Sequence, residues 1–485
     1  MLFYSMKENR IDKDCEACLK RFESINADLQ KQIKEQSLIV QKQAEKLKKL
    51  EEQLNKNSHN SNKPPSSDNP FKKRVIQNLR KKSGKKQGGQ FGHKGTTLKK
   101  VENPDKIENH HVKKCSCCGL DISSEPIQRL EKRQVFDIPI EVEVTEHRAE
   151  VKDCPNCGER VIADFPEGVT NNTQYGKNLK AHMVFLKVYE MIPYERLAEY
   201  TKFVLGVPIS KAGIEGFIHE TFNKLEEYDL EVIERILKEL VLHCDETGLR
   251  IEGFLKWLHV ASNERFTYYF PHDKRGVEAM RAMDILTRFE GIIIHDGWKS
   301  YLDFLCRHGL CNVHHLRELI YMHEEMGQEW AKEMGDLLIK IKNDKEESYP
   351  IPTERIMKYD EEYDRIIEKG YVVNPMPEIQ DEIVKRGRKK RGKVLCLLDR
   401  LKEYKESVLL FMREKDVPFG NNQAERDIRM MKVQQKISGT FRSWFGAKAF
   451  CRIRGYISTV KKQGGNVYQA LVDALNGSAI KYAAG

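Results

Sequence analysis

The spacing of apolar positions near the start of the chain predicts one long amphipathic helix. From residue 15 to residue 57, apolar and amide side chains recur at alternating intervals of three and four, without proline or glycine, for about five heptads. We expect a coiled coil that pairs two copies of the chain; a single helix packed on its own chain is the alternative. The seam consists of Leu19, Phe22, Asn26, Leu29, Ile33, Gln36, Val40, Gln43, Leu47, Leu50 and Leu54.

A basic segment follows this helix. Residues 57–70 are rich in Asn, Ser and Pro, and residues 71–100 carry eleven Lys or Arg and no Asp or Glu. The whole chain has a formal net charge of +10, which favours a polyanionic partner. We therefore expect residues 58–100 to be a flexible linker that contacts DNA, and a solvated linker without a partner is the alternative. The candidate contacts are Lys72, Lys73, Arg74, Lys81, Lys82, Lys85 and Lys86.

Two cysteine pairs predict a small zinc domain in residues 101–170. No apolar run approaches the roughly 18 residues of a membrane span, and the first residues lack the apolar core of a signal peptide, so we expect a cytoplasmic protein with reduced thiols. Under reducing conditions such pairs indicate a structural zinc rather than disulfides. Alternating residues 133–154 predict two or three strands between the pairs. The expected ligands are Cys115, Cys118, Cys154 and Cys157, with Cys117 as an alternative to Cys118 and with Gly119 and Gly158 permitting the tight turns.

Residues 171–238 have helical periodicity. The sequence GVP interrupts two predicted helices, and Ser210 is a candidate N-cap for the second. A helix, a glycine-containing turn and a second helix are typical of DNA-reading motifs, and also of any other helical hairpin.

The periodicity changes from helix to strand at residue 239. Three β-rich segments, residues 239–251, 254–262 and 265–270, are followed by a helical pattern and then by the apolar strand in residues 291–301. A right-handed helical crossover would place this fourth strand beside the first and parallel to it. Asp245 and Asp296 would then lie side by side and bind magnesium or manganese. The alternative is that both residues only end strands and cap turns.

Residues 416–462 offer a third carboxylate. Glu425 shares a helical face with Arg429, Lys432 and Lys436, which suits a metal ligand on a helix that also contacts phosphates. A capping box between Asn422 and Glu425, or an ion pair between Glu425 and Arg429, is the competing interpretation.

A long segment separates the second and third acids. Residues 317–415 are largely helical by pattern and include a second basic run at residues 385–393. We expect an insertion between two parts of one core, residues 239–316 and 416–462, followed by a C-terminal tail at 463–485. The insertion either clamps DNA or acts as a plain spacer.

Three motifs, HCDETGLRI, IIIHDGWKSY and NNQAERDIRMMK, resemble the acidic motifs of Asp-Asp-Glu transposases of the insertion-sequence-66 family. The heptad helix, the linker, the paired cysteines and the helical segment also occur in that family's order. The resemblance implies an α/β core of RNase H-like type, a mixed sheet with flanking helices, interrupted by the helical insertion and preceded by a coiled coil and a zinc-ribbon-like domain. It assigns the catalytic, metal-binding carboxylates to Asp245, Asp296 and Glu425.

The same resemblance covers LCNVHHLREL, residues 310–319. Cys311 and His314 match the family's Cys-x-x-His-x-Arg-Arg stretch, whereas Glu318 replaces its second arginine and leaves Arg317 as the candidate phosphate contact. We interpret Cys311 and His314 as a structural or DNA-positioning pair near the active site; a core cysteine and a polar helix start are the alternative.

These inferences together predict a DNA transposase. With two divalent ions it would cleave DNA at the element's terminal inverted repeats and transfer the freed strand into target DNA, as a homodimer or larger synaptic oligomer and with accessory proteins of the same element. Trp298 is a further candidate DNA contact, or ordinary packing. The alternatives are a zinc-containing DNA-binding protein without catalysis and a nuclease that cuts without joining.

Overall fold

The computed structural model describes residues 2–57, 59–61, 98–138, 140–375 and 392–482. The chain divides into two compact units: Met1–Ile76 together with His219–Gly485, and Gln77–Ile218. No helix in the described ranges is both long enough and apolar enough to cross a membrane.

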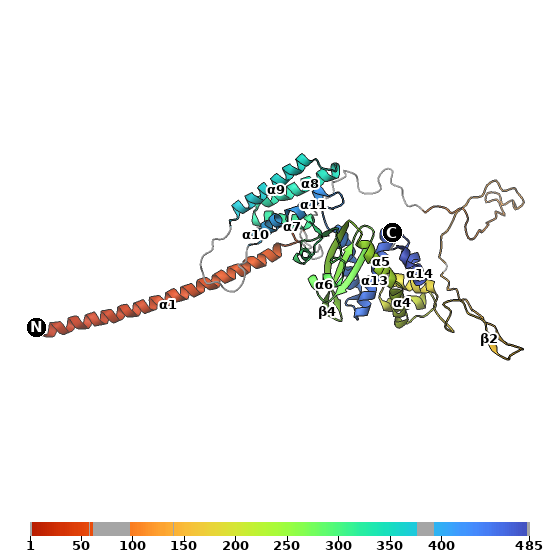
Figure 1. Ribbon diagram of the computed structural model, residues 1–485, viewed down its shortest axis with the longest axis horizontal. Coiled ribbons are helices and arrows are strands. Elements are labelled where there is room, and N and C mark those ends of the chain that lie inside the picture. Colours follow the sequence, from red (N-terminus) through yellow and green to blue (C-terminus); the bar gives the residue numbers. More distant parts are fainter. Residues whose placement is uncertain (1, 58, 62–97, 139, 376–391, 483–485) are drawn as a thin grey trace. The chain divides into compact units, whose positions relative to one another are not determined.

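The larger unit is built on a five-stranded mixed sheet in the order β5-β4-β3-β6-β7 (Figure 1). Its strands are β3 (Val241–Ile251), β4 (Phe254–Ser262), β5 (Thr267–His272), β6 (Ile292–His295) and β7 (Arg307–Leu310). The first three are antiparallel, whereas β6 lies parallel to β3 and β7 parallel to β6. The predicted position of the fourth strand, beside the first and parallel to it, is therefore confirmed.

Local sequence explains the two kinds of strand. The β3–β4 hairpin turns at Glu252 and Gly253, which both have positive φ, 53° and 81°, as the tightest hairpin turns require. The four residues of β6, IIIH, are all buried, as expected for a strand inside the parallel part of a sheet. The chain returns from β5 to β6 through the short helix α6 (Val277–Ala282).

Two helices from the end of the chain pack against the sheet. Helix α12 (Asn422–Ser438) lies against β3 and β4, and α13 (Trp444–Lys462) lies against β5. The Tyr269 hydroxyl donates a hydrogen bond to the Asp427 carbonyl at 2.9 Å, and the Thr267 amide donates to the Thr459 hydroxyl at 3.1 Å. Residues 158 and 192 positions apart are thus joined in one core. Helices α5 (Glu226–Ile236) and α14 (Val467–Leu475) belong to the same unit.

A helical subdomain separates β7 from α12. It contains α7 (Asn312–Met326), α8 (Glu329–Glu347), α9 (Thr353–Val373), α10 (Lys393–Glu403) and α11 (Lys405–Arg413). Its buried side chains, among them Trp330, Tyr363 and Leu398, form one core with Ile294 and Leu310 of the sheet. The subdomain is therefore packed on the β6–β7 side of the sheet. Most of the basic run at residues 385–393 lies outside the described residues.

Helix α1 (Leu2–Asn55) confirms the predicted long helix (Figure 1). Its seam is exposed: Ile33, Val40 and Leu47 are 64%, 62% and 60% accessible. The rest of the described chain therefore does not cover these side chains, and pairing with a second copy stays a prediction.

The smaller unit holds α2 (Lys177–Val184), η2 (Phe185–Tyr189), α3 (Tyr194–Phe203) and the start of α4 (Lys211–Lys224). The Ser210 hydroxyl accepts a hydrogen bond from the Gly213 amide at 3.0 Å, which confirms the predicted N-cap of α4. The helix–turn–helix pattern is therefore present, and DNA reading by it stays a prediction.

The strands predicted in residues 133–154 are largely absent. Only β1 (Val151–Asp153) forms there, paired with β2 (Arg160–Ile162), while the described residues 133–150 form no strand. Alternation stabilises a strand only where a partner covers its apolar face, and Val135 and Val144 are 93% and 87% exposed. The prediction of a hairpin between the cysteine pairs was therefore wrong for these residues.

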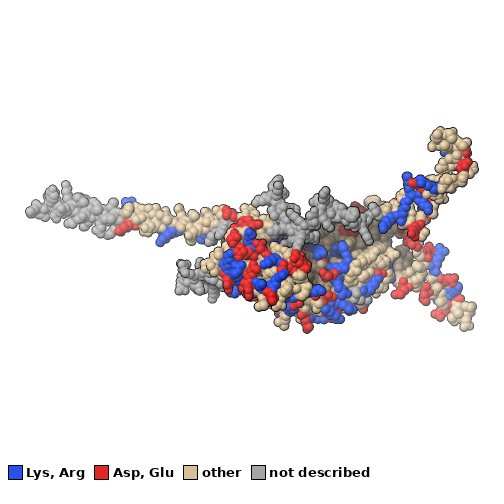
Figure 2. Space-filling model, turned by 90° about the horizontal axis from the view of Figure 1, so that it is seen from above, with Lys and Arg blue, Asp and Glu red and all other residues tan. Residues whose placement is uncertain are grey.

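The positive charge of the chain is concentrated outside the described residues. Residues 62–97 carry ten Lys or Arg against one Asp, and residues 376–391 carry six against three acids, an excess of twelve where the whole chain has +10. Figure 2 accordingly shows acidic and basic side chains intermixed on the face that it presents. The candidate contacts from Lys72 to Lys86 fall in the first of these segments and so lie outside the described residues.

The exposed seam of α1 predicts that charge inserted there breaks the dimer. The double substitution Ile33→Lys and Val40→Lys places like charges at two core positions of a coiled coil, so we expect a monomer by light scattering where the wild-type chain is a dimer. The control, Ala27→Lys with Gln41→Lys, adds the same charge on the outer face and should leave the dimer intact. A monomeric wild-type chain, or a dimer that survives the seam variant, contradicts the prediction.

Candidate active site

The strand register places the first two predicted acids opposite each other. Strands β3 and β6 pair in parallel up to His243 and Ile294. Asp245 lies two residues beyond this last pair on β3, and Asp296 lies two residues beyond it on the other side, immediately after the end of β6. Because side chains two residues apart on a strand share a face, Asp245 lies on the same face of β3 as His243.

One oxygen of each aspartate is held by a nearby backbone amide. Asp245 Oδ1 accepts a hydrogen bond from the Glu246 amide at 2.8 Å, and Asp296 Oδ1 accepts one from the Trp298 amide at 2.8 Å. Gly297 has φ 86°, which permits the sharp turn after Asp296. Asp296 thus supports a turn, as the alternative interpretation expected, and lies beside Asp245 as well.

Asn421 anchors the start of α12 to the sheet and so positions Glu425. Its side chain bonds to His243 Nδ1 at 2.9 Å and donates to the Cys244 carbonyl at 2.7 Å, while its amide donates to Cys311 Sγ at 3.1 Å. Three separate segments therefore converge on one buried asparagine. Glu425 lies one turn into the helix, directly beyond this anchor.

The capping-box interpretation of Glu425 was wrong. Asn421, not Asn422, precedes the helix, and its side chain is used by the sheet instead of by the helix amides. Glu425 Oε1 is buried and has no hydrogen-bond partner among the described residues. An acid placed in this way is not explained by helix capping.

The three acids interact electrostatically. Burial raises the pKa of Asp245 to about 8, and the negative charges of Glu246, Asp296 and Glu425 add to the rise, against the Glu246 amide, which lowers it. The carboxylates therefore repel one another within a poorly solvated space, where a divalent cation would compensate their charge. Carboxylate oxygens are ligands that suit magnesium or manganese. The ligand atoms of Asp245, Asp296 and Glu425 do not all lie within 4.8 Å of one another in the described chain, so a shared ion stays a prediction.

Sequence reasoning missed the partners of Glu246. This carboxylate is fully buried on the opposite face of β3 and accepts two hydrogen bonds from the Arg275 guanidinium, at 3.0 and 2.7 Å, and one from the Tyr301 hydroxyl at 2.7 Å. Burial raises its pKa all the same. The signal was present: adjacent acids on a buried strand must face opposite sides, and the second then needs a buried partner.

Trp298 follows Asp296 in the chain and packs against Arg275, the arginine that pairs with Glu246. The Arg275 guanidinium lies 4.2 Å from the centre of the Trp298 ring and 4.9 Å from that of Trp257. Trp298 thus takes part in cation–π packing, the alternative considered for it, and DNA contact by its exposed part stays a prediction.

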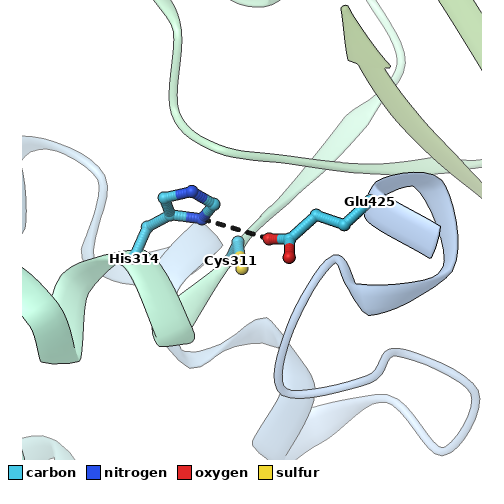
Figure 3. Close-up of side chains that lie close together, drawn as sticks. All are labelled: Cys311, His314 and Glu425. Carbon is cyan, nitrogen blue, oxygen red and sulfur yellow. Dashed lines mark ion pairs between the residues drawn. The ribbon is translucent and has the colours of Figure 1, made fainter. Parts of the chain in front are cut away.

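Cys311 and His314 lie next to Glu425. Figure 3 shows the His314 ring and the Glu425 carboxylate pointing toward each other, with the Cys311 sulfur beside them. His314 Nδ1 and Glu425 Oε1 are 3.9 Å apart, and the three possible ligand atoms lie within 4.8 Å of one another. Burial raises the pKa of Cys311 to about 11 and lowers that of His314. The pair predicted to lie near the active site contacts its third acid.

The predicted phosphate contacts near the site have different surroundings. Arg429 and Lys436 are exposed on α12, whereas Lys432 donates a hydrogen bond to the Gly248 carbonyl at 2.6 Å and so ties the helix to β3. Arg317 is half-buried on α7. The adjacent Glu318, which replaces an arginine of the family motif, forms an ion pair with Arg400 of the helical subdomain. DNA contact by these cations stays a prediction.

Both predicted cysteine turns are formed in the smaller unit. The Gly119 amide donates to the Cys115 carbonyl at 3.0 Å, and the Gly158 amide donates to the Cys154 carbonyl at 2.8 Å, with φ of 73° and 74° at the glycines. Hydrogen bonds from the backbone of the second cysteine in each pair lower the pKa of Cys115 and Cys154, which favours the thiolates that zinc requires. Within the described ranges no three of the four sulfurs lie within 4.8 Å of one another, since residues 133–150 form no hairpin to join the turns. One zinc shared by both pairs stays a prediction.

Comparison with known families identifies the class of protein, an enzyme that acts on nucleic acid. The sequence model of the IS66 transposase family matches residues 172–449, which include the whole sheet, the helical subdomain and all three acids. This match covers more than half of the 485 residues, and the chain belongs to the IS66 family of transposases. The model of a family of unknown function, DUF6444, matches residues 20–99, the heptad helix and the basic segment. No curated protein matches the chain.

The raised pKa of Asp245 predicts an unusual dependence of stability on pH. In magnesium-free buffer the folded chain keeps a proton that the unfolded chain releases, so stability falls as pH rises from 3.8 to about 8. Asp245→Asn removes this penalty and should stabilise the protein by about 5 kcal/mol at pH 8, from ~1.4 kcal/mol per pKa unit, and by much less near pH 4. The midpoint of thermal unfolding at the two pH values measures the difference.

The matched control for this prediction is Asp273→Asn. Asp273 pairs with Lys256, and its pKa is lowered by that hydrogen bond, so the control should not stabilise the protein at pH 8. An Asp245→Asn variant that melts with the wild type at pH 8, or gains equally at both pH values, contradicts the prediction.

Proposed function

We propose that this protein is an Asp-Asp-Glu transposase that cleaves DNA at the ends of its element and joins the freed ends to target DNA. The observation that carries the proposal is the register of β3 and β6, which sets Asp245 opposite Asp296, together with the electrostatic interaction of both with Glu425. The strand order, with β6 parallel to β3, is the arrangement expected for an RNase H-like core.

In this proposal Asp245, Asp296 and Glu425 hold two magnesium or manganese ions. Such ions, when bound, activate the attacking oxygen and stabilise the leaving oxygen of a phosphodiester. The chain contributes the geometry: backbone amides fix one oxygen of each aspartate, and Asn421 fixes the start of the helix that carries Glu425. The ion pair between buried Glu246 and partly exposed Arg275 stabilises β3 from the opposite face.

The proposed reaction has two steps of the same kind. In the first, a water oxygen bonds to the phosphorus at the end of the element, and the bond to the 3′ oxygen breaks, leaving a 3′ hydroxyl and a 5′ phosphate. In the second, that 3′ hydroxyl bonds to a phosphorus of target DNA and displaces another 3′ oxygen. Each step forms and breaks one phosphorus–oxygen bond, so no covalent protein intermediate is needed.

The distribution of charge supports DNA binding by segments outside the catalytic core. Two segments hold the chain's excess of positive charge: residues 62–97, which precede the cysteine pairs in the sequence, and residues 376–391, which fall between α9 and α10. Cations that neutralise phosphates provide affinity without reading sequence, whereas base contacts from α3 and α4 would provide specificity. The coiled coil would pair two protomers and thereby two ends of the element.

The experiment that tests this proposal is cleavage of a supercoiled plasmid that carries the element's ends, in magnesium. Asp245→Asn, Asp296→Asn and Glu425→Gln should each lower cleavage by at least ~100-fold, since each removes a metal ligand, while binding to end DNA stays close to wild type. Asp273→Asn should cleave normally.

A pre-cleaved end supplied with target DNA separates the remaining possibilities. Joining by the wild type supports a transposase, whereas cutting without joining would indicate a nuclease. A wild type that binds the ends and never cuts would indicate a DNA-binding protein without catalysis and would overturn the proposal.

A further inference from the structure

We propose that Cys311, His314 and Glu425 form a second cation site beside the three acids, selective for a zinc-like transition metal rather than magnesium. Cys311 follows β7, His314 lies in the first turn of α7, and Glu425 lies in the first turn of α12. Three elements thus direct a sulfur, a nitrogen and an oxygen to one point (Figure 3).

The separations suit a tetrahedral ion. Atoms bound to zinc at ~2.0–2.3 Å lie ~3.3–3.8 Å from one another. The ligand atoms here lie within 4.8 Å of one another, with 3.9 Å between His314 Nδ1 and Glu425 Oε1. Small side-chain rotations that move these atoms by about 1 Å or less would therefore complete the site.

Two of the three ligand atoms lack any other partner. His314 Nδ1 and Glu425 Oε1 are both buried without a hydrogen bond in the described part of the chain, and their separation is too long for one between them. Buried polar atoms are nearly always satisfied, so this pair calls for a group that binds both at once. A cation does so.

The donor set distinguishes this site from the one formed by the aspartates. Magnesium prefers oxygen ligands and near-octahedral geometry, whereas zinc accepts thiolate, imidazole and carboxylate together. Binding would release the Cys311 thiol proton to solvent, because the thiolate is the ligand. Three protein ligands leave a fourth position open to water or a DNA phosphate oxygen.

The surroundings hold the ligands in place. The Asn421 amide donates to Cys311 Sγ at 3.1 Å, a bond that a metal-bound thiolate keeps. The Cys311 amide donates to the His295 carbonyl at 2.8 Å, and the His314 amide donates to the Cys311 carbonyl at 3.1 Å. Such supporting bonds orient ligands and tune affinity.

Glu425 belongs both to this site and to the proposed site of the three acids, so a metal ion bound here would affect cleavage. This part rests on the proposed function: a zinc-like ion on Cys311 and His314 would draw Glu425 away from Asp245 and Asp296, and so would inhibit magnesium-dependent cleavage. Bound zinc would thus act as a negative regulator of the transposase.

Cobalt binding by the full-length chain tests the site without reference to activity. Co²⁺ reports thiolate ligation through its charge-transfer absorption, and equilibrium dialysis counts the ions. We expect Cys311→Ala and His314→Gln each to bind one Co²⁺ fewer than the wild type, or to bind it at least ~10-fold more weakly. Cys306→Ala, which removes another buried thiol close by in the sequence, should bind as the wild type does. All variants keep Cys115, Cys118, Cys154 and Cys157. Any Co²⁺ bound by these cysteines is therefore the same in the wild type and in each variant, and does not affect the difference in stoichiometry.

The two variants keep the test decisive. The His314 side chain is 14% exposed whereas Cys311 is fully buried, so His314→Gln reports on the site even where Cys311→Ala fails to fold. Wild-type stoichiometry and absorption in folded His314→Gln would overturn the proposal.

A titration of Zn²⁺ into the magnesium-dependent cleavage assay tests the shared ligand. Zn²⁺ should inhibit the wild type, and Cys311→Ser, which keeps an acceptor for the Asn421 amide but loses the thiolate, should need at least ~10-fold more Zn²⁺ for half inhibition. If the wild type binds cobalt as expected but Zn²⁺ does not inhibit its cleavage, the proposal that both sites share Glu425 is overturned. Normal cobalt binding with no cleavage under any condition would count against the transposase and leave the metal site standing.

Discussion

Repulsion among partly buried carboxylates is the constraint on which this structure depends. Asp245 lies on β3 and Asp296 follows the neighbouring strand β6, and the charges of Asp296 and of Glu425, 129 residues further along the chain, both act on Asp245. Grouping negative charges out of water destabilises the fold, which the raised pKa of Asp245 expresses directly. The chain tolerates this cost because the rest of the core holds the three elements together, and a bound cation would turn the repulsion into a binding site.

Asn421 links this group to the fold. It bonds to β3 through two side-chain contacts and to Cys311 after β7, so the helix with Glu425 cannot shift without breaking contacts to both strands. The helical subdomain between β7 and α12 has its own core, and it also shares that core with Ile294 and Leu310. A long insertion is therefore compatible with a precise site, because its two ends are fixed on the same sheet.

The sequence alone predicted the strand pairing that depends on chain topology. A crossover from an antiparallel meander leaves few positions for the fourth strand, so the place of β6 beside β3 followed from strand order, and the adjacency of Asp245 and Asp296 was expected from it. The contacts of Glu246 with Arg275 and Tyr301 could not be assigned, because many arginines and tyrosines in the sequence were equally available to a buried acid. The role of Asn421 was missed since an asparagine before a helix usually caps it. For residues 133–150 the pattern itself gave a wrong prediction. Apolar and polar residues alternate clearly there, but no partner strand pairs with them among the described residues.

The central claim is that three acids distant in the sequence share one cation site. Titration with Mn²⁺, followed by electron paramagnetic resonance of the free ion, measures this most directly in the wild type and in Asp245→Asn, Asp296→Asn and Glu425→Gln. The account predicts that every one of the three substitutions weakens Mn²⁺ binding by at least ~10-fold, since each removes a charged ligand from the same ions. Wild-type affinity in a folded Asp296→Asn or Glu425→Gln protein would contradict it.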